Sequence, residues 1–253
     1  MPLPLGLQLY TVRDALQGNF EDTVRRIAAM GYAGVEAAGF PNTDAQTASQ
    51  LFNTLGLQVP SAHAPLPLGD DQADVLRTLE TLGCKYMICP YQPPEEFTSV
   101  DGIKRVCDRL NAANDIARAN GYIFGYHNHH FEYIPFDGQY PYQIMLENLS
   151  PDIVFEIDTY WVQTAGADVN AVLNELGDRV TLLHIKDGPC VLGEPQTAVG
   201  AGKMDVPAIL AAASPAVEWL IVELDHSAGD MLADVENSYT YLTQKGLARG
   251  RAS

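Results

Sequence analysis

Short apolar runs alternate along this chain with longer segments in which apolar residues recur every three or four positions. Eight runs have the length and composition of buried strands: residues 5–10, 33–37, 57–64, 86–89, 122–127, 153–158, 180–184 and 219–223. Helical patterns over residues 19–30, 73–82 and 103–120 each stop at a glycine, the usual residue just past a helix end. This rhythm predicts a parallel sheet covered by helices.

No linker rich in Gly, Pro or Ser interrupts the alternation of strand and helix patterns. Eight repeats of a strand followed by a helix favour a closed barrel over an open sheet, and about 250 residues is the usual size of such a barrel. We therefore expect residues 1–253 to form one α/β domain, a (β/α)8 TIM barrel.

Ionisable residues stand at the ends of six predicted strands: Glu36, His63, His127, Asp158, His184 and Glu223. In a (β/α)8 barrel the chemistry takes place where the strands end. Burying a charged group is costly unless it has a partner. Side chains that meet at one end of a barrel would supply each other's partners, most simply through a shared divalent cation.

The last four strand ends, His127, Asp158, His184 and Glu223, combine two imidazoles with two carboxylates. This mixture of nitrogen and oxygen donors suits Mn²⁺, Fe²⁺, Co²⁺ or Zn²⁺ better than Ca²⁺. Each residue also has a structural interpretation. Asp158 would cap the turn into Thr159, and Glu223 would pair with a surface lysine.

Three histidines lie within residues 127–130, at the end of the fifth predicted strand. Imidazole suits both metal ligation and proton transfer near neutral pH. The alternative is a solvated loop whose histidines bond to the backbone. Because residues two apart on a strand share a face, His129 should follow His127, and Lys186 should follow His184. Lys186 would then bind substrate oxygens or steady an enolate, unless it is a solvated loop lysine.

The balance of charge restricts the partners of the protein. The sequence has 32 acidic and 15 basic residues and a formal charge of −17, which repels nucleic acid and anionic membranes. No apolar run is long enough to span a bilayer, and no signal-peptide pattern opens the chain. The four cysteines, without a CxxC pair, indicate free thiols. We expect a cytoplasmic protein.

Several motifs occur in a familiar order: LQLYTVRD, MGYAGVEAAGF, SAHAPL, YHNHHFEY, FEIDTYW, LLHIKDG and IVELDHSAGD. Over nearly the whole chain they resemble the xylose isomerase-like TIM-barrel superfamily, the sugar phosphate isomerase/epimerase family. The resemblance implies a divalent cation, usually Mn²⁺, with one ligand from each of the last four strands. Asp158, His184 and Glu223 fill three of these positions, whereas His127 stands where the family's epimerases have a glutamate.

The expected chemistry begins when the cation polarises a substrate carbonyl or hydroxyl and a base removes the adjacent proton. Glu223 or His127 is the candidate base, and His129 and Lys186 would donate a proton or stabilise negative charge. We expect the substrate also to contact three further residues: His63; Trp161, an apolar wall for a sugar ring; and Glu132, which resembles a substrate-contacting glutamate of the family.

We favour a metal-dependent isomerase or epimerase acting on a keto sugar or polyol, unphosphorylated because no basic cluster marks the strand ends. The HNH sequence at residues 127–129 supports an alternative, a dehydratase or lyase acting on an inosose or 3-keto sugar. A sugar-binding barrel without catalysis is a third hypothesis, and a homo-oligomer is left open. The glycine-rich residues 188–204 are a candidate lid.

Overall fold

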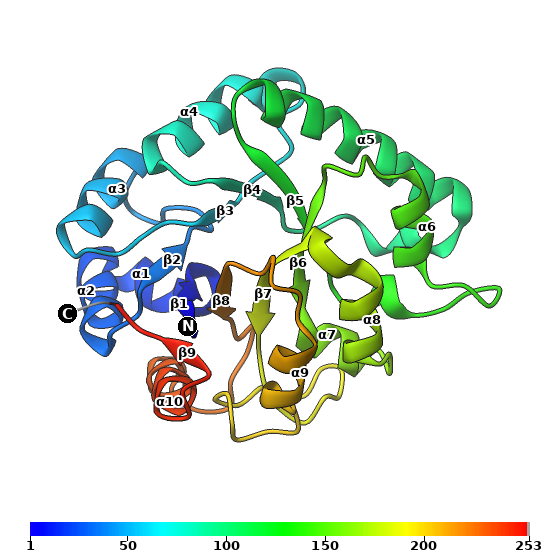
Figure 1. Cartoon of the computed structure of the whole chain (residues 1–253). Helices are drawn as coiled ribbons and strands as arrows, with labels where there is room; N and C mark the ends of the chain where they lie inside the picture. The colour runs from blue at the N-terminus through cyan, green and yellow to red at the C-terminus, as the bar shows by residue number, and fades with distance from the viewer. Residues whose placement is uncertain (252–253) are drawn as a thin grey trace.

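The computed structural model describes residues 1–251 and shows a barrel of strands surrounded by helices (Figure 1). Eight strands build the barrel wall: β1 (Leu3–Gln8), β2 (Gly34–Glu36), β3 (Ser61–His63), β4 (Tyr86–Cys89), β5 (Ile123–His127), β6 (Val154–Asp158), β7 (Val180–Ile185) and β8 (Trp219–Val222). A short ninth strand, β9 (Ala248–Arg249), pairs with the start of β1.

All neighbouring strands run parallel, in the order β2-β1-β8-β7-β6-β5-β4-β3. The two ends of this series, β2 and β3, meet through isolated parallel bridges that join Gly34 to Gln58 and Ala37 to Ala62. The wall is thereby nearly closed. The prediction of a (β/α)8 TIM barrel is confirmed.

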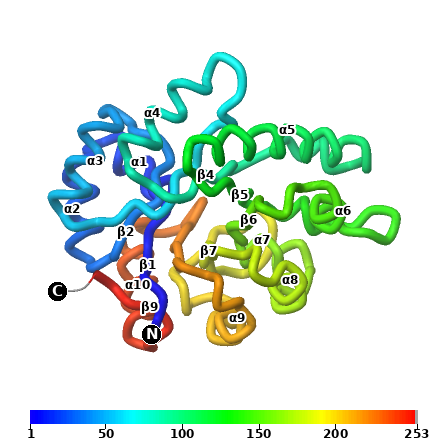
Figure 2. The backbone as a smooth tube through the Cα atoms, turned by 45° about the horizontal axis from the view of Figure 1, so that its top comes forward, coloured from blue at the N-terminus to red at the C-terminus, as the bar shows by residue number. Residues whose placement is uncertain are grey.

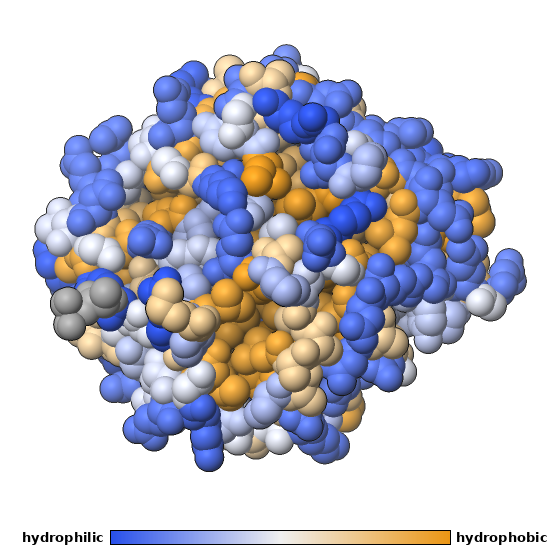
Figure 3. All heavy atoms as spheres, viewed as in Figure 1, coloured by the Kyte–Doolittle hydropathy of each residue, from blue (hydrophilic) through white to orange (hydrophobic). Residues whose placement is uncertain are grey.

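The helices lie outside the strands, as the tube in Figure 2 also shows. They are α1 (Arg13–Gly18), α2 (Phe20–Met30), α3 (Ala45–Thr54), α4 (Gln72–Leu82), α5 (Val100–Ala119), α6 (Pro141–Asn148), α7 (Thr159–Thr164), α8 (Val169–Leu176), α9 (Val206–Ala212) and α10 (Met231–Gln244). Among residues 1–251, no helix is both long enough and apolar enough to cross a membrane. Hydrophilic side chains dominate the outer edge over α4 and α5 (Figure 3).

Some predicted boundaries were wrong for local reasons. The first strand stops at Gln8 rather than at residue 10, because the Gln8 side chain accepts a hydrogen bond from the Tyr10 amide and begins a 3-10 turn. The third strand is only Ser61–His63, since Pro60 before it has no N–H to donate to a neighbouring strand. Glu223 lies one residue beyond β8.

The interior of the barrel has two levels. Apolar side chains fill the lower level, including Ile88, Leu182 and Ile221, all fully buried. Gly125 on β5 leaves room for this packing, because a Cβ there would lie 2.6 Å from the Ile88 Cδ1 atom. Towards the carboxyl ends, the inward positions become ionisable. Alternation along β7 places His184 two residues after Leu182 on the same face of the strand.

Candidate active site

Four predicted metal ligands come together at the carboxyl ends of β5 to β8. One ligand atom from each of His127, Asp158, His184 and Glu223 lies within 4.8 Å of the others, and all four residues are buried. We call this set the Asp158 cluster. Its members come from four successive strands, which is why their wide spacing in the sequence becomes a compact group.

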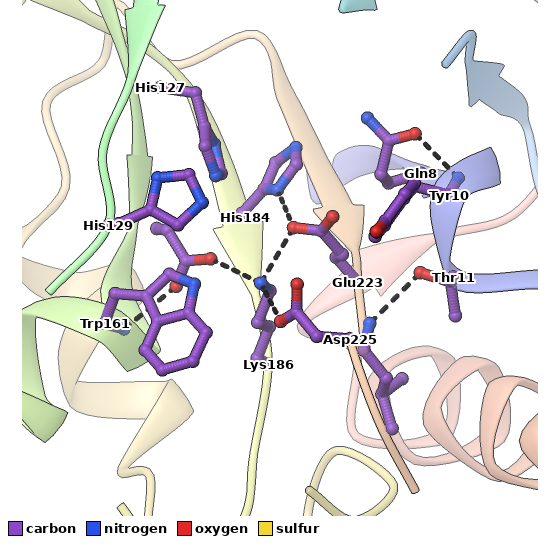
Figure 4. A network of polar contacts seen from close by, with 12 residues as sticks. Gln8, Tyr10, Thr11, His127, His129, Trp161, His184, Lys186, Glu223 and Asp225 are labelled. Carbon is purple, nitrogen blue, oxygen red and sulfur yellow. Dashed lines mark hydrogen bonds and ion pairs between the residues drawn. The ribbon is translucent and has the colours of Figure 1, made fainter. Parts of the chain in front are cut away.

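Lys186 projects into the Asp158 cluster from just beyond the end of β7. Its Nζ atom lies 2.9 Å from Asp158 Oδ2, 2.9 Å from Glu223 Oε2 and 2.5 Å from Asp225 Oδ2. Figure 4 shows the ammonium group beside the carboxylates of Glu223 and Asp225. Although burial lowers the pKa of Lys186, the three carboxylates raise it well above its ordinary value. Lys186 is therefore a buried, charged lysine rather than a solvated loop residue.

Asp158 combines the two roles that its position suggested. Its Oδ1 atom accepts a hydrogen bond from the Trp161 amide at 3.0 Å and caps α7. Its Oδ2 atom makes no hydrogen bond and faces Lys186. Burial raises the pKa of Asp158 to about 6, although Lys186 opposes this shift. Capping holds the carboxylate in place, and its second oxygen is paired with the Lys186 ammonium group.

Both ring nitrogens of His184 contact carboxylates. Nδ1 lies 2.7 Å from Glu223 Oε2, and Nε2 lies 2.8 Å from Glu36 Oε2. Burial lowers the pKa of His184, but Glu156, Glu223 and Glu36 raise it well above its ordinary value. Burial likewise raises the pKa of Glu223, whereas Lys186 and His184 lower it well below its usual range. Glu223 is thus held as a carboxylate.

The two histidines at the end of β5, His127 and His129, have lowered pKa values, in contrast to His184. Burial and the nearby His184 lower the pKa of His127 well below its ordinary value. Burial and the charge of Lys186 lower the pKa of His129 to about 4. The His129 ring stacks on Phe131, with centroids 5.5 Å apart, and on Trp161 at 6.3 Å. The surroundings therefore disfavour the protonated form of both rings.

A cavity of about 480 Å³ opens beside the Asp158 cluster. Its lining includes Tyr10, His63, Tyr91, His127, His129 and Glu223. This volume lies within the range of small-molecule sites. Of the residues expected to contact a substrate, His63 lines the cavity, and Trp161 lies next to it, with its ring 5.0 Å from Lys186 Nζ (Figure 4).

Glu132 is placed differently from the other expected substrate contacts. It is fully buried, and its two oxygens accept hydrogen bonds from the Tyr126 hydroxyl at 2.5 Å and from the His129 amide at 2.9 Å. With both oxygens bonded inside the protein, Glu132 holds His129 in position. Burial raises its pKa to about 7.

Glu156 belongs to the same end of the barrel and was not predicted. It is fully buried on β6, and its Oε2 atom lies 2.7 Å from His63 Nε2 and 3.2 Å from both His127 Nδ1 and His184 Nε2. Its position two residues before Asp158, on the same face of the strand, is the signal that the sequence offers.

The candidate lid is held by one buried carboxylate. Asp187 accepts hydrogen bonds from the amides of Gly188, Gly200, Gly202 and Met204. Gln196, in the middle of this segment, bonds in turn to the Asp225 side chain and amide. Residues 188–204 are therefore fastened at their base and joined to the site.

The Asp158 cluster fits a divalent cation by its donor set. Two imidazoles and two carboxylates offer a mixed nitrogen and oxygen environment. Lys186 contributes one positive charge among three carboxylates, so the group retains negative charge to attract a cation. Asp158 Oδ2 also lacks a hydrogen bond.

Comparison with solved structures reveals several relatives of the same shape. A sugar phosphate isomerase/epimerase from Parabacteroides distasonis is 25% identical, with a TM-score of 0.82 over 98% of this chain and 100% of that one. The IOLI protein with a bound zinc atom is 16% identical, with a TM-score of 0.75 and coverage of 97% and 98%. The probable 3-DHS dehydratase AsbF from Bacillus anthracis is 12% identical, with a TM-score of 0.74 and coverage of 95% and 99%.

The last two similarities, at such low identity, show the fold alone. No curated protein matches the sequence significantly. The model of the family described as xylose isomerase-like TIM barrel matches residues 24–243, which is most of the chain. The chain therefore belongs to the xylose isomerase-like TIM-barrel family, whose characterised neighbours are mostly enzymes.

Proposed function

We propose that the protein is a metal-dependent isomerase or epimerase that moves a proton next to the carbonyl of a keto sugar or related polyol. The observation that carries this proposal is the Asp158 cluster with Lys186, placed beside a cavity of about 480 Å³. A cavity of this size and a formal charge of −17 favour a small, neutral sugar over nucleic acid.

The residues that would hold the cation are His127, Asp158, His184 and Glu223. Mn²⁺ is the proposed ion, with Zn²⁺, Co²⁺ or Fe²⁺ as alternatives, since this donor set accepts all of them. When bound, the ion would act as a Lewis acid that polarises a substrate oxygen and makes the neighbouring C–H more acidic. The protein's own side chains perform the remaining tasks.

Glu223 is the proposed base. It lines the cavity, and its lowered pKa keeps it in the ionised form that a base requires. Lys186 would stabilise the negative charge that develops on the substrate oxygen, because its ammonium group is fixed before the substrate arrives. The neutral ring of His129 would accept a proton from the substrate on its side of the cavity and, once protonated, return it.

A lyase is the second candidate, and His127 is the observation that favours it. A two-carboxylate epimerase needs a second carboxylate facing the substrate, and here an imidazole ends β5. Glu132 cannot replace that carboxylate because both of its oxygens are already bonded. A neutral imidazole that accepts the proton from the substrate carbon becomes an imidazolium, which would then protonate the departing hydroxyl or alkoxide; this sequence suits elimination of water or an alcohol.

Solvent exchange tests the function. Keto sugars, inososes and 3-keto sugars are incubated with the Mn²⁺-loaded protein in deuterated water, and the products are analysed by mass spectrometry. We expect an isomeric product that carries deuterium at carbon; elimination instead leaves a product lacking water or an alcohol. Glu223→Gln should lower the rate at least about 100-fold, and the surface control Glu175→Gln should not. Binding without exchange at any carbon would identify a non-catalytic sugar-binding barrel.

The cellular location and assembly are part of the proposal. All four cysteines are unpaired, and three of them are buried, which suits a reducing compartment such as the cytoplasm. Whether the chain forms a homo-oligomer is left open, and size-exclusion chromatography with light scattering measures it directly.

A further inference from the structure

A second group of metal-binding side chains lies next to the Asp158 cluster. One ligand atom from each of His63, His127, Glu156 and His184 lies within 4.8 Å of the others. We call this set the Glu156 cluster. It shares His127 and His184 with the Asp158 cluster and adds His63 and Glu156, neither of which the proposed function requires as a ligand.

The atoms at the centre of the Glu156 cluster make more close contacts than they have ring hydrogens to share, although each has one hydrogen-bond partner. His63 Nε2 lies 2.7 Å from Glu156 Oε2 and 3.2 Å from Glu36 Oε2, and His184 Nε2 lies 3.2 Å and 2.8 Å from the same two atoms. A ring nitrogen carries at most one hydrogen and can donate to only one of the two oxygens. At least two of these four close contacts therefore lack a shared proton.

Further polar atoms of the same group are buried without a partner. His127 Nδ1 makes no hydrogen bond, although it lies 3.2 Å from Glu156 Oε2. Glu156 Oε1 and Glu36 Oε1 also make none. Unpartnered buried polar atoms are rare because each one carries a desolvation cost. A cation would accept the lone pairs of these nitrogens and oxygens and remove the conflict.

The spacing of the donors matches a small transition-metal ion. With metal–ligand distances of about 2.0–2.1 Å, the ligand atoms of a tetrahedral site are about 3.3–3.4 Å apart. The observed separations of Glu156 Oε2 from the three imidazole nitrogens are 2.7, 3.2 and 3.2 Å. Opening this group by about half an ångström would therefore accommodate such an ion.

We propose that the Glu156 cluster is a second cation site, with His63, His127, Glu156 and His184 as ligands, that takes a late transition-metal ion such as Zn²⁺ or Co²⁺. Three imidazoles and one carboxylate form a more nitrogen-rich set than the Asp158 cluster, and imidazole donors favour these ions over Mn²⁺. Because the two clusters share His127 and His184, a cation in the Glu156 cluster withdraws ligands from the Asp158 cluster and weakens its affinity for Mn²⁺.

Cobalt binding tests this proposal, because the ligand-field absorption of Co²⁺ reports its coordination. Metal-stripped protein is titrated with Co²⁺, and bound cobalt is counted by inductively coupled plasma mass spectrometry after desalting. Three proteins are compared: the native chain, Asp158→Asn with Glu223→Gln, and the same double variant with His63→Gln added. The His63 side chain is 9% exposed, and the other three ligands are more deeply buried; circular dichroism verifies that each variant folds.

The double variant should retain about one Co²⁺ per chain, with the intense absorption of a tetrahedral site. Adding His63→Gln should weaken this binding at least about tenfold. Equal cobalt binding before and after His63→Gln, or none in the folded double variant, would overturn the proposal. The proposed function fails separately: a native chain that takes no Mn²⁺, while the double variant still binds Co²⁺, would remove the function and leave this site.

Discussion

Replacing Lys186 with methionine removes the ammonium group that contacts Asp158, Glu223 and Asp225. Methionine fills much of the same volume, so the loss is chiefly electrostatic. Lys186 is 1% exposed, and the two nearest buried carboxylates lie 2.9 Å from its Nζ atom. At an effective dielectric constant of about 20, each contact is worth about 6 kcal/mol before the cost of desolvation.

The net effect on stability is smaller than this sum. Taking one member from a buried ion pair costs about 3–5 kcal/mol, because the remaining charge is left without compensation. Uptake of a proton by Asp158, whose pKa is already about 6, limits the loss. For a chain of this size the variant should melt about 6–20 °C below the native protein when metal is absent.

A divalent cation should offset part of this loss. With the competing ammonium gone, the Asp158 cluster should bind Mn²⁺ more tightly, and each tenfold gain in affinity returns about 1.4 kcal/mol at saturation. The stability deficit of Lys186→Met should therefore shrink when Mn²⁺ replaces a chelator in the buffer.

Urea unfolding followed by circular dichroism, with chelator and with Mn²⁺, measures both effects. Lys85→Met is the matched control, since Lys85 Nζ lies 2.6 Å from Glu218 in a pair exposed to solvent, which should contribute about 0–1 kcal/mol. A Lys186→Met deficit no larger than that of the control, or a deficit that widens with Mn²⁺, would refute the reasoning.

Three further changes have defined outcomes. Burial raises the pKa of Glu132 from 4.5 to about 7, so its contribution to stability is present below pH 4.5 and is lost as pH rises to 7. Glu132→Gln lacks this titration, so between pH 4 and pH 8 its free energy of unfolding should rise by about 3 kcal/mol relative to that of the native protein. The same difference in urea midpoint between the variant and the native protein at pH 4 and at pH 8 would contradict this. Asp187→Ala should speed amide hydrogen exchange in residues 188–204, and unaltered exchange would show that other contacts hold the segment. Gly125→Ala, whose Cβ would lie 2.6 Å from Ile88 Cδ1, should cost about 1–3 kcal/mol in unfolding free energy, and no loss would mean that Ile88 repacks freely.

The barrel and the Asp158 cluster were accessible from sequence because both follow from repetition. An apolar run that ends in an ionisable residue, found several times in succession, identifies parallel strands and the end at which they meet. This pattern groups four residues, His127, Asp158, His184 and Glu223. The structure brings one ligand atom of each within 4.8 Å of the others.

Other features depend on geometry that no local pattern carries. Glu156 lies inside the body of β6, and only the barrel's curvature brings it to His63, 93 residues away in the chain. The sequence suggests that Glu132 contacts the substrate, but in the structure the Tyr126 hydroxyl and the His129 amide donate hydrogen bonds to its two oxygens. The strand β3 is short because Pro60 precedes it and has no N–H. The effect of this proline depends on whether a neighbouring strand needs an amide donor at that position, which the sequence alone does not tell.

Manganese binding tests the central claim most directly. Metal-stripped native protein and the Asp158→Asn plus Glu223→Gln variant are titrated with Mn²⁺, and free Mn²⁺ is followed by electron paramagnetic resonance. The account predicts about one Mn²⁺ per native chain and none in the folded variant, since the two carboxylates are the oxygen donors of the Asp158 cluster. Equal binding by both proteins, or no binding by the native chain, would contradict it.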